Sequence, residues 1–569
     1  MHMNAALRRQ LQRILTQTRP EDENAAALDT GSFEIAHALC RERAYILLST
    51  PLSSDMDVLE LGAGCGTRTR FLAERVRSVT ALDEDPDILE LNAFRNRDLT
   101  NINYRPGPWK ETLAALPTGS LFSLAVLVDV EPAPELLAAI RPLLADDGLI
   151  LIACDNPQGV KFWSDPNQSP PDRSDILCEL QARLAAAGFS SPHVAYPYPD
   201  HRFPLFIYTD ASLPAPGHCY FNCFTWDREQ PSFDSTALWN RLIEDDRFPA
   251  CSNSYLLHAR PAAYNAPDSA IFPEYTKICA IRSAALRICT SVFRQRSGTR
   301  FVEKKPLEAS ASAHVAAIAR WNAALSKQYA DVPLSVNRGE TAGDAYRLEF
   351  LEAKTLYDDI ISAIRRNDEV SALRLMENVF GLIRSAATAP FAPTPAYAEL
   401  FGSLPLPDIL CCSPVTDVDM NFDNFFLTPP GEMTLIDYEF TFDFPIPVDF
   451  PIFRALFYFF RSNPWIVTEH PSFVQEAWKR AHIDRSLFDT FAKQERNFQL
   501  HVHGPHDALS FFHQFNGNGI RGLFRRFFSA PARAKIWPLV PNWLRMTGIA
   551  WMNRRAGKQE QNSSYAPEA

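Results

Sequence analysis

The sequence lacks any segment that could cross a membrane and any cysteine pattern typical of a metal site. No run of 18 uncharged apolar residues occurs, and the most apolar stretch, Phe450–Phe460, is short and contains Arg454. The 11 cysteines form no CxxC pair, and Cys411 and Cys412 are merely adjacent. No apolar core of a signal peptide stands at the N-terminus. We therefore expect a cytoplasmic protein in a reducing compartment that does not span a membrane.

Basic charge is also scarce, with one local exception. The 56 Lys and Arg residues are outnumbered by 67 Asp and Glu, and the net charge of -11 argues against a general nucleic-acid binder. Residues 519–558, however, carry nine Lys or Arg and no acid, interleaved with Phe and Trp. Such a segment favours peripheral contact with an anionic membrane, and the alternative is a solvated helix packed on the preceding domain. Residues 519–569 are therefore interpreted as a basic aromatic tail.

The length of 569 residues predicts more than one domain. Residues 1–30 are polar and Ala-rich, which suggests an N-terminal extension with one helix and a loose segment. Residues 31–262 begin with a helix at Phe33–Leu48 and then alternate strand-like and helix-like segments, the pattern of an α/β domain with a doubly wound, mostly parallel sheet. Residues 275–515 bring several strand-like segments close together before helices dominate, which indicates a separate α+β domain.

A glycine-rich loop organises the first domain. The apolar run Val58–Leu61 predicts a buried strand, and Gly62, Gly64 and Gly66 follow it directly, ahead of a predicted helix. Glycine allows the chain to turn sharply while a ligand approaches the backbone. The N–H groups at the start of the helix then face that ligand. The loop therefore predicts a nucleotide-like ligand at the end of this strand.

An acid lies at the position where such a fold holds the ribose. Asp83 ends the second predicted strand, 21 positions after Gly62 (83 minus 62), close to the spacing of about 20 expected for a ribose-binding carboxylate. The loop is GxGxG rather than the GxGxxG of NAD-binding proteins, and Glu60 precedes it. Together these residues resemble class I S-adenosylmethionine (SAM)-dependent methyltransferases. The resemblance implies that the glycines line the amino-acid part of SAM, Asp83 binds its ribose and Glu60 orients the methionyl end.

The same resemblance assigns two further residues to SAM binding. Trp109, in Pro106–Trp109 after the third predicted strand, falls where adenine is usually held, and Asp129 ends the fourth predicted strand. No proton-abstracting base stands out, and positioning alone can supply much of the rate of methyl transfer. The alternative is a Rossmann-like fold with a different or inactive site.

Two later segments are more distinctive. Asn156-Pro157-Gln158-Gly159-Val160-Lys161 follows the fifth predicted strand, and Tyr196-Pro197-Tyr198-Pro199-Asp200 comes later. They resemble segments in a subgroup of these methyltransferases that is found with bacterial cell-surface polysaccharide machinery. The alternative interpretation is that both segments only shape loops.

The second domain carries residues with the spacing of a phosphotransferase. Kinase-like folds need an Asp near the acceptor hydroxyl, an Asn five residues later that binds the metal, and a second Asp that bridges metal and phosphates. Asp419, Asn424 and Asp437 have this spacing, with a predicted turn at Pro429–Gly431. Lys304 is the candidate for contacting the α- and β-phosphates. Lys305 is its alternate.

The second domain resembles the small-molecule branch of the kinase-like fold, which includes choline and aminoglycoside kinases. By this resemblance the domain has two lobes, and Glu349 begins a hinge that holds adenine through its backbone. The chain departs from protein kinases in several ways. Asp417 replaces the loop His, Tyr438-Glu439 replaces Phe-Gly, no glycine-rich loop precedes Lys304, and residues 310–325 offer it no Glu partner, with Glu308 marginal. A pseudokinase or scaffold is therefore the alternative to an active kinase.

The order of the two domains is informative in itself. A methyltransferase followed by a kinase-like domain resembles the bifunctional methyltransferase–kinase family that terminates O-antigen polysaccharide chains. The resemblance implies SAM as cofactor, ATP with Mg²⁺ if the second domain is active, a glycan or lipid-linked polysaccharide acceptor, a glycosyltransferase partner, and a place at the cytoplasmic face of the inner membrane. The competing hypotheses are a methyltransferase whose second domain only binds glycan or partner proteins, and a small-molecule methyltransferase unrelated to glycans.

Overall fold

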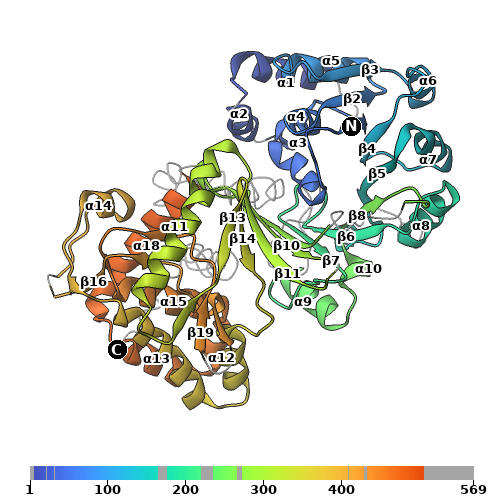
Figure 1. Ribbon diagram of the computed structural model, residues 1–569. Helices are drawn as coiled ribbons and strands as arrows, with labels where there is room; N and C mark the ends of the chain where they lie inside the picture. Colours follow the sequence, from blue (N-terminus) through green and yellow to red (C-terminus); the bar gives the residue numbers. More distant parts are fainter. Residues whose placement is uncertain are drawn as a thin grey trace, which may run out of the picture. The chain divides into compact units, whose positions relative to one another are not determined.

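The protein divides into two compact units. The computed structural model describes residues 5–20, 22–30, 32–163, 176–219, 235–264, 272–295, 297–407, 409–428 and 432–504. Within them, unit 1 holds the chain up to 280 together with 289–300, and unit 2 holds 281–288 and 301–504 (Figure 1). The predicted tail at 519–569 and the turn at Pro429–Gly431 lie outside the described residues.

Unit 1 is built on one sheet. Its strands are β1 Asp57–Leu61, β2 Ser78–Asp83, β3 Ile102–Pro106, β4 Phe122–Val128, β5 Leu144–Asp155, β6 His193–Tyr198, β7 Phe206–Thr209, β8 Ser254–Ala259, β9 Pro273–Ile278 and β10 Ile288–Arg294. Their order in the sheet is β10-β9-β7-β6-β8-β5-β4-β1-β2-β3. The strands β1 to β5 pair in parallel, and β8 pairs antiparallel with both β5 and β6. Strands β1 to β5 thus form the predicted doubly wound, parallel arrangement of a Rossmann-like fold. Strands β6 to β10 are joined by antiparallel pairings, so the sheet of unit 1 as a whole is mixed rather than mostly parallel.

The helices of unit 1 connect these strands or precede them. They are α1 Ala5–Gln17, α2 Glu23–Asp29, α3 Phe33–Leu39, α4 Thr67–Ala73, α5 Pro86–Arg95, α6 Trp109–Ala114, α7 Pro134–Ile140, α8 Ile176–Ala186, α9 Ser235–Glu244 and α10 Phe248–Cys251. Consecutive residues of β1 and β4 are buried. Successive side chains of a strand point to opposite faces, so both faces of the sheet are covered at its centre. The alternating elements between Val58 and Cys154 are confirmed.

The N-terminal prediction needs two corrections. The supposedly loose part of residues 1–30 contains a second helix, α2. The helix predicted over Phe33–Leu48 breaks at Cys40, whose ψ of 129° is extended, and a 3₁₀ segment, Arg41–Ser49, follows. The amide of Arg41 donates to the Asn24 side chain at 2.9 Å, so an α-helical hydrogen bond is replaced by one to α2.

Other differences concern strands that the sequence pattern does not show. Tyr196–Tyr198 lies in β6 rather than in a loop, and β6 and β7 pair antiparallel. β9 pairs with β7, so the strand that follows the predicted boundary near 262–275 extends the sheet of unit 1. Pro197 hides the strand character of β6, because proline is disfavoured inside sheets.

Unit 2 combines small sheets with a group of helices. Its strands are β11 Arg300–Pro306, β12 Leu334–Val336, β13 Gly339–Ala342, β14 Ala345–Glu349, β15 Ala389–Pro390, β16 Cys411–Ser413, β17 Thr416–Asp417, β18 Phe425–Thr428, β19 Glu432–Leu435, β20 Thr441–Phe442 and β21 Ile446–Pro447. Its helices are α11 Ser312–Gln328, α12 Leu356–Arg365, α13 Glu369–Ser385, α14 Pro395–Phe401, α15 Asp449–Ser462, α16 Pro464–Glu469, α17 Pro471–Arg480 and α18 Phe488–His503. Strands and helices therefore both contribute to this unit.

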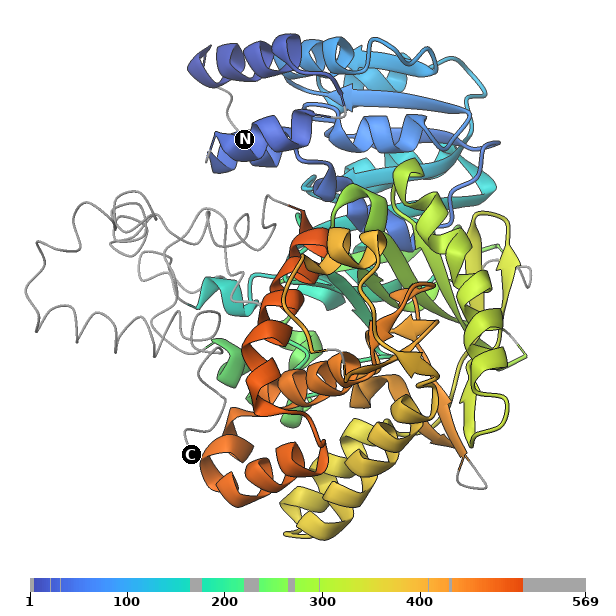
Figure 2. The ribbon, with the colours of Figure 1, turned by 90° about the vertical axis from the view of Figure 1, so that its left-hand side faces the viewer.

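The arrangement of unit 2 places its sequence motifs. β11 pairs antiparallel with β14, and β14 with β13, while β12, β19 and β18 form a second sheet. α18 contacts α14 and α15, as the orange-red helix in Figure 2 shows. The aromatic rings of Phe401, Phe450 and Phe498 pack among these three helices. Arg454, on α15, lies 3.3 Å from Asp419 Oδ1, so α15 contacts the segment that carries Asp419.

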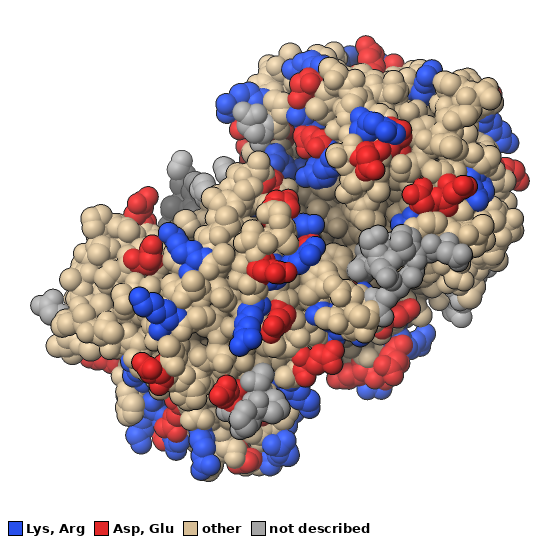
Figure 3. All heavy atoms as spheres, viewed as in Figure 1, with Lys and Arg blue, Asp and Glu red and all other residues tan. Residues whose placement is uncertain are grey.

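Two surface properties follow from the described residues. None of the described helices combines the length and apolar character needed to cross a bilayer. On the face drawn in Figure 3, acidic and basic side chains are interspersed, without a large patch of either sign.

Candidate functional site

The glycine loop of unit 1 has the geometry predicted for a ligand-binding turn. Gly62, Gly64 and Gly66 adopt φ of +67°, +56° and +88°, a region that favours glycine. The Gly64 N–H donates to Oδ2 of Asp83 at 2.9 Å. A Cβ added at Gly64 would meet no atom closer than the Gly62 carbonyl oxygen at 4.0 Å. The end of β1 and the end of β2 are thus joined, with open space on one side of the loop.

Helix α5 fixes the loop from behind. Asn92 donates to the Gly64 carbonyl at 3.1 Å, and Asn96 donates to the Gly66 carbonyl at 3.2 Å. Arg95 donates to Thr67 Oγ1 at 2.6 Å and to Oε2 of Glu23, from α2, at 2.8 Å. The sequence did not single out these residues, because their spacing only shows that they share a helix face.

Glu60 is a fully buried carboxylate beside the loop. Its Oε2 accepts from Thr69 Oγ1 at 2.7 Å, and its Oε1 lies 3.6 Å from Arg68 Nε without a hydrogen-bond partner. Arg68 also donates to the Gly62 carbonyl at 2.7 Å. Burial raises the pKa of Glu60 to about 7, against the lowering effect of Arg68. A cationic group beside Oε1 would satisfy the atom that the protein leaves unpaired.

The segment that leads to Trp109 starts next to the acid. Pro106 is the register partner of Asp83, and the Gly107 N–H donates to the Asp83 carbonyl at 3.0 Å. Trp109 begins α6 and packs in part against the hydrophobic core. The structure therefore brings this segment to the Asp83 end of the loop, as an adenine contact requires.

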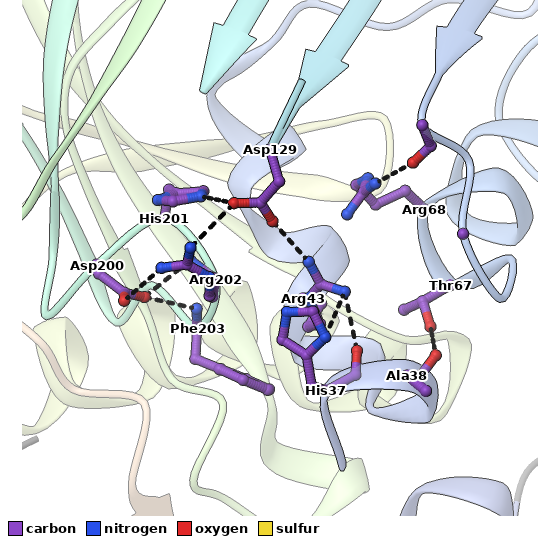
Figure 4. A network of polar contacts seen from close by, with 12 residues as sticks. His37, Ala38, Arg43, Thr67, Arg68, Asp129, Asp200, His201, Arg202 and Phe203 are labelled. Atoms are coloured by element: carbon purple, nitrogen blue, oxygen red, sulfur yellow. Dashed lines mark hydrogen bonds and ion pairs between the residues drawn. The ribbon is translucent and has the colours of Figure 1, made fainter. Parts of the chain in front are cut away.

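Asp129 belongs to a charged network rather than to the glycine loop (Figure 4). It has a φ of +59° at the end of β4. Its Oδ2 accepts from Arg43 at 3.0 Å, and its Oδ1 lies 2.7 Å from His201 Nε2 and 3.2 Å from Arg202. Burial would raise the pKa of Asp129, but His201, Arg202 and Arg43 hold it well below its usual value. The predicted SAM-binding role of Asp129 thus has no contact that supports it.

The two distinctive segments of the sequence meet at this network. Lys161, from the Asn-Pro-Gln-Gly-Val-Lys segment, donates to Asp155 Oδ1 at 2.5 Å and to Asp200 Oδ2 at 3.3 Å. Arg202 binds both oxygens of Asp155 at 2.9 Å each. Opposite charges hold the pKa of Asp155 and of Asp200 below the usual value despite burial. The segments therefore form one partly exposed salt-bridge network at the ends of β4 and β5.

Backbone fit explains the polar residues of the first segment. Asn156 donates to the Ala250 carbonyl at 2.9 Å and to the Ser252 carbonyl at 2.7 Å. A Cβ at Gly159 would lie 2.7 Å from the Asn253 Cα, so glycine is required there for packing. Asn156 and Gly159 thus shape the loop, as the alternative interpretation held, whereas Lys161 joins the charged network.

A cavity of about 500 Å³ lies beside this network. Its polar lining includes His37, Asp129, Glu131, Asp155, Arg183 and Arg202. Arg43 donates to His37 Nδ1 at 3.3 Å, which leaves Nε2 as the protonated nitrogen. Burial and Arg43 lower the pKa of His37 well below its usual value, so the ring is neutral at pH 7. His37 is therefore a hydrogen-bond donor to the cavity and not a base.

Unit 2 brings its motif residues together. Lys304 Nζ donates to Asp437 and, at 2.5 Å, to Oε2 of Glu439. Asn424 donates from its side chain to the Asp419 carbonyl at 2.7 Å. Burial would lower the pKa of Lys304, but Asp437 and Glu439 raise it to about 12. Lys304 and the two motif segments thus lie at one place in the unit.

The carboxyl group predicted to face the acceptor has a raised pKa. Asp419 Oδ1 accepts from Asn421 at 2.7 Å and lies 3.3 Å from Arg454. Burial raises the pKa of Asp419 to about 6, against the lowering effect of Arg454. Burial and Asp419 raise the pKa of Asp417, at the position of the loop His, well above its usual value. A carboxylate with a pKa near neutrality is suited to accept a proton from a hydroxyl.

Among the described residues, no group of three or more His, Cys, Asp or Glu is placed to hold a metal ion. Asn424 and Asp437 would therefore bind Mg²⁺ only together with phosphate oxygens and water, which is common for this ion. The Glu349 N–H donates to the Arg338 carbonyl, and its own carbonyl accepts from Asn337. An adenine would have to use backbone groups later in the predicted hinge.

Two candidate partners in this region are engaged elsewhere. Lys305 is half-exposed and pairs with Glu303 at 2.8 Å, so Lys304 is the lysine of the site. Glu308 pairs with Arg287 at 2.7 Å rather than with Lys304. Sequence patterns did not predict Glu439 as the partner of Lys304. In unit 1 they did not predict the charged network that contains Arg43, His201 and Arg202. These contacts join segments far apart in the chain.

Comparison with known proteins finds similarity to methyltransferases. No family model matches the chain. Over 83 residues it is 40% identical to phosphoethanolamine N-methyltransferase 1 of Caenorhabditis elegans, a stretch that covers 14% of this chain and only 18% of that protein. Similar solved structures include phosphoethanolamine N-methyltransferase 1 of Haemonchus contortus with phosphoethanolamine and S-adenosylhomocysteine (18% identity, 47% of this chain, 52% of that chain, TM-score 0.26). A SAM-dependent methyltransferase of Archaeoglobus fulgidus is also similar (18% identity, 40% and 94%, TM-score 0.26). TM-scores this low carry no functional conclusion, whereas the sequence likeness and the strand order both agree with a methyltransferase fold of class I.

Proposed function

We propose that unit 1 is a SAM-dependent methyltransferase. The observation that carries the proposal is the contact between the Gly64 N–H and the Asp83 carboxylate, beside a loop face on which a Cβ would meet open space. A ligand with a ribose can use this carboxylate while it lies against the glycine backbone. The 83-residue likeness to a methyltransferase supports the same class of reaction.

The residues of the loop fit SAM, which supplies a methyl group on a positively charged sulfur. Each Asp83 oxygen accepts one backbone N–H, from Gly64 and from Asp85, and keeps a lone pair for a ribose hydroxyl. Glu60 Oε1, buried without a partner, would accept from the ammonium of the methionyl end. Arg68 holds Glu60 and the Gly62 carbonyl, so it orients both groups.

The cavity at the ends of β4 and β5 is the proposed acceptor site. Its charged lining has three carboxylates, from Asp129, Glu131 and Asp155, and two guanidinium groups, from Arg183 and Arg202. Hydroxyl groups can donate to the carboxylates and accept from the guanidinium groups. The balance of acceptors and donors suits a polyhydroxylated acceptor such as a sugar, and His37 adds one neutral donor.

Titration calorimetry tests the methyltransferase proposal. We expect the protein to bind SAM and S-adenosylhomocysteine with one site, and Asp83→Ala to weaken both by at least about tenfold, the equivalent of one lost charge-assisted hydrogen bond. Asp146→Ala, in an exposed part of β5, is the matched control and should leave the affinity unchanged. Absence of SAM binding by the unaltered protein would refute the proposal.

We further propose that unit 2 transfers a phosphoryl group from ATP to a hydroxyl group. Lys304, Asp419, Asn424 and Asp437 lie together, and the raised pKa of Asp419 favours a role as proton acceptor. ATP with Mg²⁺ would supply the transferred group, held by Lys304 and Asp437. Asp419→Ala and Asp437→Ala should abolish ATP-dependent phosphorylation of a glycan acceptor. Failure of the unaltered protein to bind ATP would favour the alternative, a pseudokinase that binds glycan or a partner protein.

The two activities together suggest modification of a bacterial cell-surface polysaccharide, as the resemblance to the O-antigen chain-terminating methyltransferase–kinase WbdD implies. The acceptor would be a lipid-linked glycan at the cytoplasmic membrane face, with a glycosyltransferase as a partner. A second candidate is a small-molecule methyltransferase, which the phosphoethanolamine-specific name of the Caenorhabditis relative favours. Methyl transfer from labelled SAM to a phosphorylated oligosaccharide or to phosphoethanolamine separates the two.

A further inference from the structure

The catalytic lysine of unit 2 lacks the partner that kinase sites ordinarily provide. In protein kinases the lysine on a strand of the small lobe pairs with a Glu on the helix that follows, and the pair must be in place for activity. Here Lys304 lies on β11, and the helix that follows, α11, contains no Asp or Glu. An ion pair of that type therefore has to come from another element.

Two carboxylates occupy the place of the missing partner. Lys304 Nζ contacts Oε2 of Glu439 at 2.5 Å and also contacts Asp437. The two acids differ in their surroundings, because the Asp437 side chain is 32% exposed and the Glu439 side chain only 2%. Asp437 also has a φ of +55°, a strained conformation of the kind found at functional positions. The buried acid is the better candidate for a permanent partner.

Glu439 is clamped from its other side. Its Oε1 lies 2.6 Å from Arg282, so each carboxylate oxygen has a cationic partner. The segment of Arg282 is fixed in turn, since the Ser283 N–H donates to the Val502 carbonyl at the end of α18 at 2.7 Å. Glu439 thus cannot turn away from Lys304 without also breaking its contact with Arg282.

We propose that Glu439 is a positioning residue that replaces the helix-borne Glu: it is the fixed partner of Lys304, while Asp437 is a partner that Lys304 exchanges for phosphate oxygens. The proposal rests on the proposed phosphotransferase function of unit 2. When nucleotide and metal bind, Asp437 is needed by the metal and Lys304 by the phosphates, so their direct contact has to open. Glu439, which Arg282 clamps, is then the residue that keeps the ammonium group of Lys304 oriented toward the phosphates.

Four variants test this assignment. Glu439→Gln removes the charge at constant size, and Glu439→Asp keeps the charge. Arg282→Gln removes the clamp but keeps both residues of the Lys304–Glu439 contact. The double variant Arg282→Gln/Glu439→Gln removes the guanidinium together with its carboxylate partner, in case the single Gln variant fails to fold. The affinity for Mg-ATP is measured by calorimetry. We expect at least about a tenfold loss in both proteins that carry Glu439→Gln and less than about threefold in Glu439→Asp, with a loss between these two in Arg282→Gln, which removes the clamp on Glu439.

A second readout does not need activity. The rate at which Lys304 is acylated by an N-hydroxysuccinimide ester is measured by mass spectrometry, with the half-exposed Lys305 as reference in the same peptide. Because the free amine reacts, each unit by which the pKa of Lys304 falls should raise its relative rate about tenfold. We expect acceleration in Glu439→Gln and in the double variant, and little change in Arg282→Gln.

The outcomes separate the two proposals. If the unaltered protein binds no Mg-ATP, the proposed phosphotransferase function is wrong. If, in addition, Glu439→Gln folds and leaves the acylation rate of Lys304 unchanged, the pairing of Lys304 with Glu439 is wrong as well. If Mg-ATP binds equally well to the unaltered protein and to the folded double variant, Glu439 is not the positioning residue, although the kinase function survives. Loss of affinity with faster acylation, and near-normal values in Glu439→Asp, support the assignment.

Discussion

Replacing Gly64 and Gly66 separately by Ala should separate ligand binding from stability. Both glycines have positive φ, so an Ala at either position costs about 1–2 kcal/mol of backbone strain. At Gly64 the new methyl group would meet only the Gly62 carbonyl oxygen at 4.0 Å. It would project into the open space on the loop, where we propose that SAM binds. Gly64→Ala should therefore lose no more stability than this strain but should lose SAM affinity by at least about tenfold.

At Gly66 the same methyl group meets the side chains that hold the loop. It would lie 2.5 Å from Asn92 Oδ1 and 2.5 Å from Asn96 Nδ2, so both amides have to move. Their hydrogen bonds to the carbonyls of Gly64 and Gly66 would be lost, at about 1–3 kcal/mol for each buried group left unpaired. Together with the strain, Gly66→Ala should cost about 3–8 kcal/mol of unfolding free energy.

Thermal melting of unit 1 and calorimetry with SAM measure the two effects. Gly119→Ala is a matched control, because Gly119 has a φ of +85° with no atom within 4 Å of a Cβ and stands in a turn away from the loop. It should show the strain of Gly64→Ala and keep the affinity for SAM. Equal destabilisation by Gly64→Ala and Gly66→Ala, or unaltered SAM binding by Gly64→Ala, would refute the reasoning about the loop.

Three further predictions follow from buried charges and from the sequence. The pKa of Glu60 is raised from 4.5 to about 7, so between these pH values the folded state binds more protons than the unfolded state. The free energy of unfolding therefore falls as the pH rises through this range. Glu60→Gln should remove about 3 kcal/mol of this pH dependence, measured by urea unfolding at pH 5 and pH 8. Glu23→Gln leaves Arg95 buried without a charge partner and should destabilise unit 1 by about 3–5 kcal/mol in urea unfolding. Glu74→Gln, in an exposed pair, should change the free energy of unfolding by less than about 1 kcal/mol. Similar losses in the two variants would contradict the distinction between the buried and the exposed pair. Deletion of residues 519–569 should release the protein from anionic liposomes, and unchanged binding in a flotation assay would rule out the tail as the anchor.

The glycine loop and its acid could be predicted because their signals are local in the sequence. The spacing of Gly62, Gly64 and Gly66 after an apolar run, with Asp83 at the end of the next strand, is fixed by the geometry of one βαβ unit. Strand β6 escaped prediction because its proline is atypical of a sheet, and the break at Cys40 did so because a side chain from α2 captures the Arg41 N–H. Tertiary contacts override local pattern in both cases.

The charged partners of the sites were beyond prediction for a related reason. Arg43 and Asp129 are 86 residues apart in the chain, and Lys304 and Glu439 are 135 apart. No spacing rule links residues so distant, and a lone Arg or Glu in a sequence has many surface explanations. Motifs thus identify the groups that touch a ligand, because a ligand imposes its own dimensions on one short segment. The groups that hold those residues in place are set by the fold alone.

This division of roles has a consequence for the function proposed for unit 2. Judged by its motifs, the unit lacks the carboxylate that fixes its lysine, and that gap argued for a pseudokinase. Judged by its contacts, the carboxylate is present, because Glu439 reaches Lys304 from the residue that replaces a motif glycine. A departure from a motif is therefore evidence of lost function only when no other residue fills the same position in space. At Lys304 the position is filled, and the absence of an acid on α11 no longer counts against phosphoryl transfer.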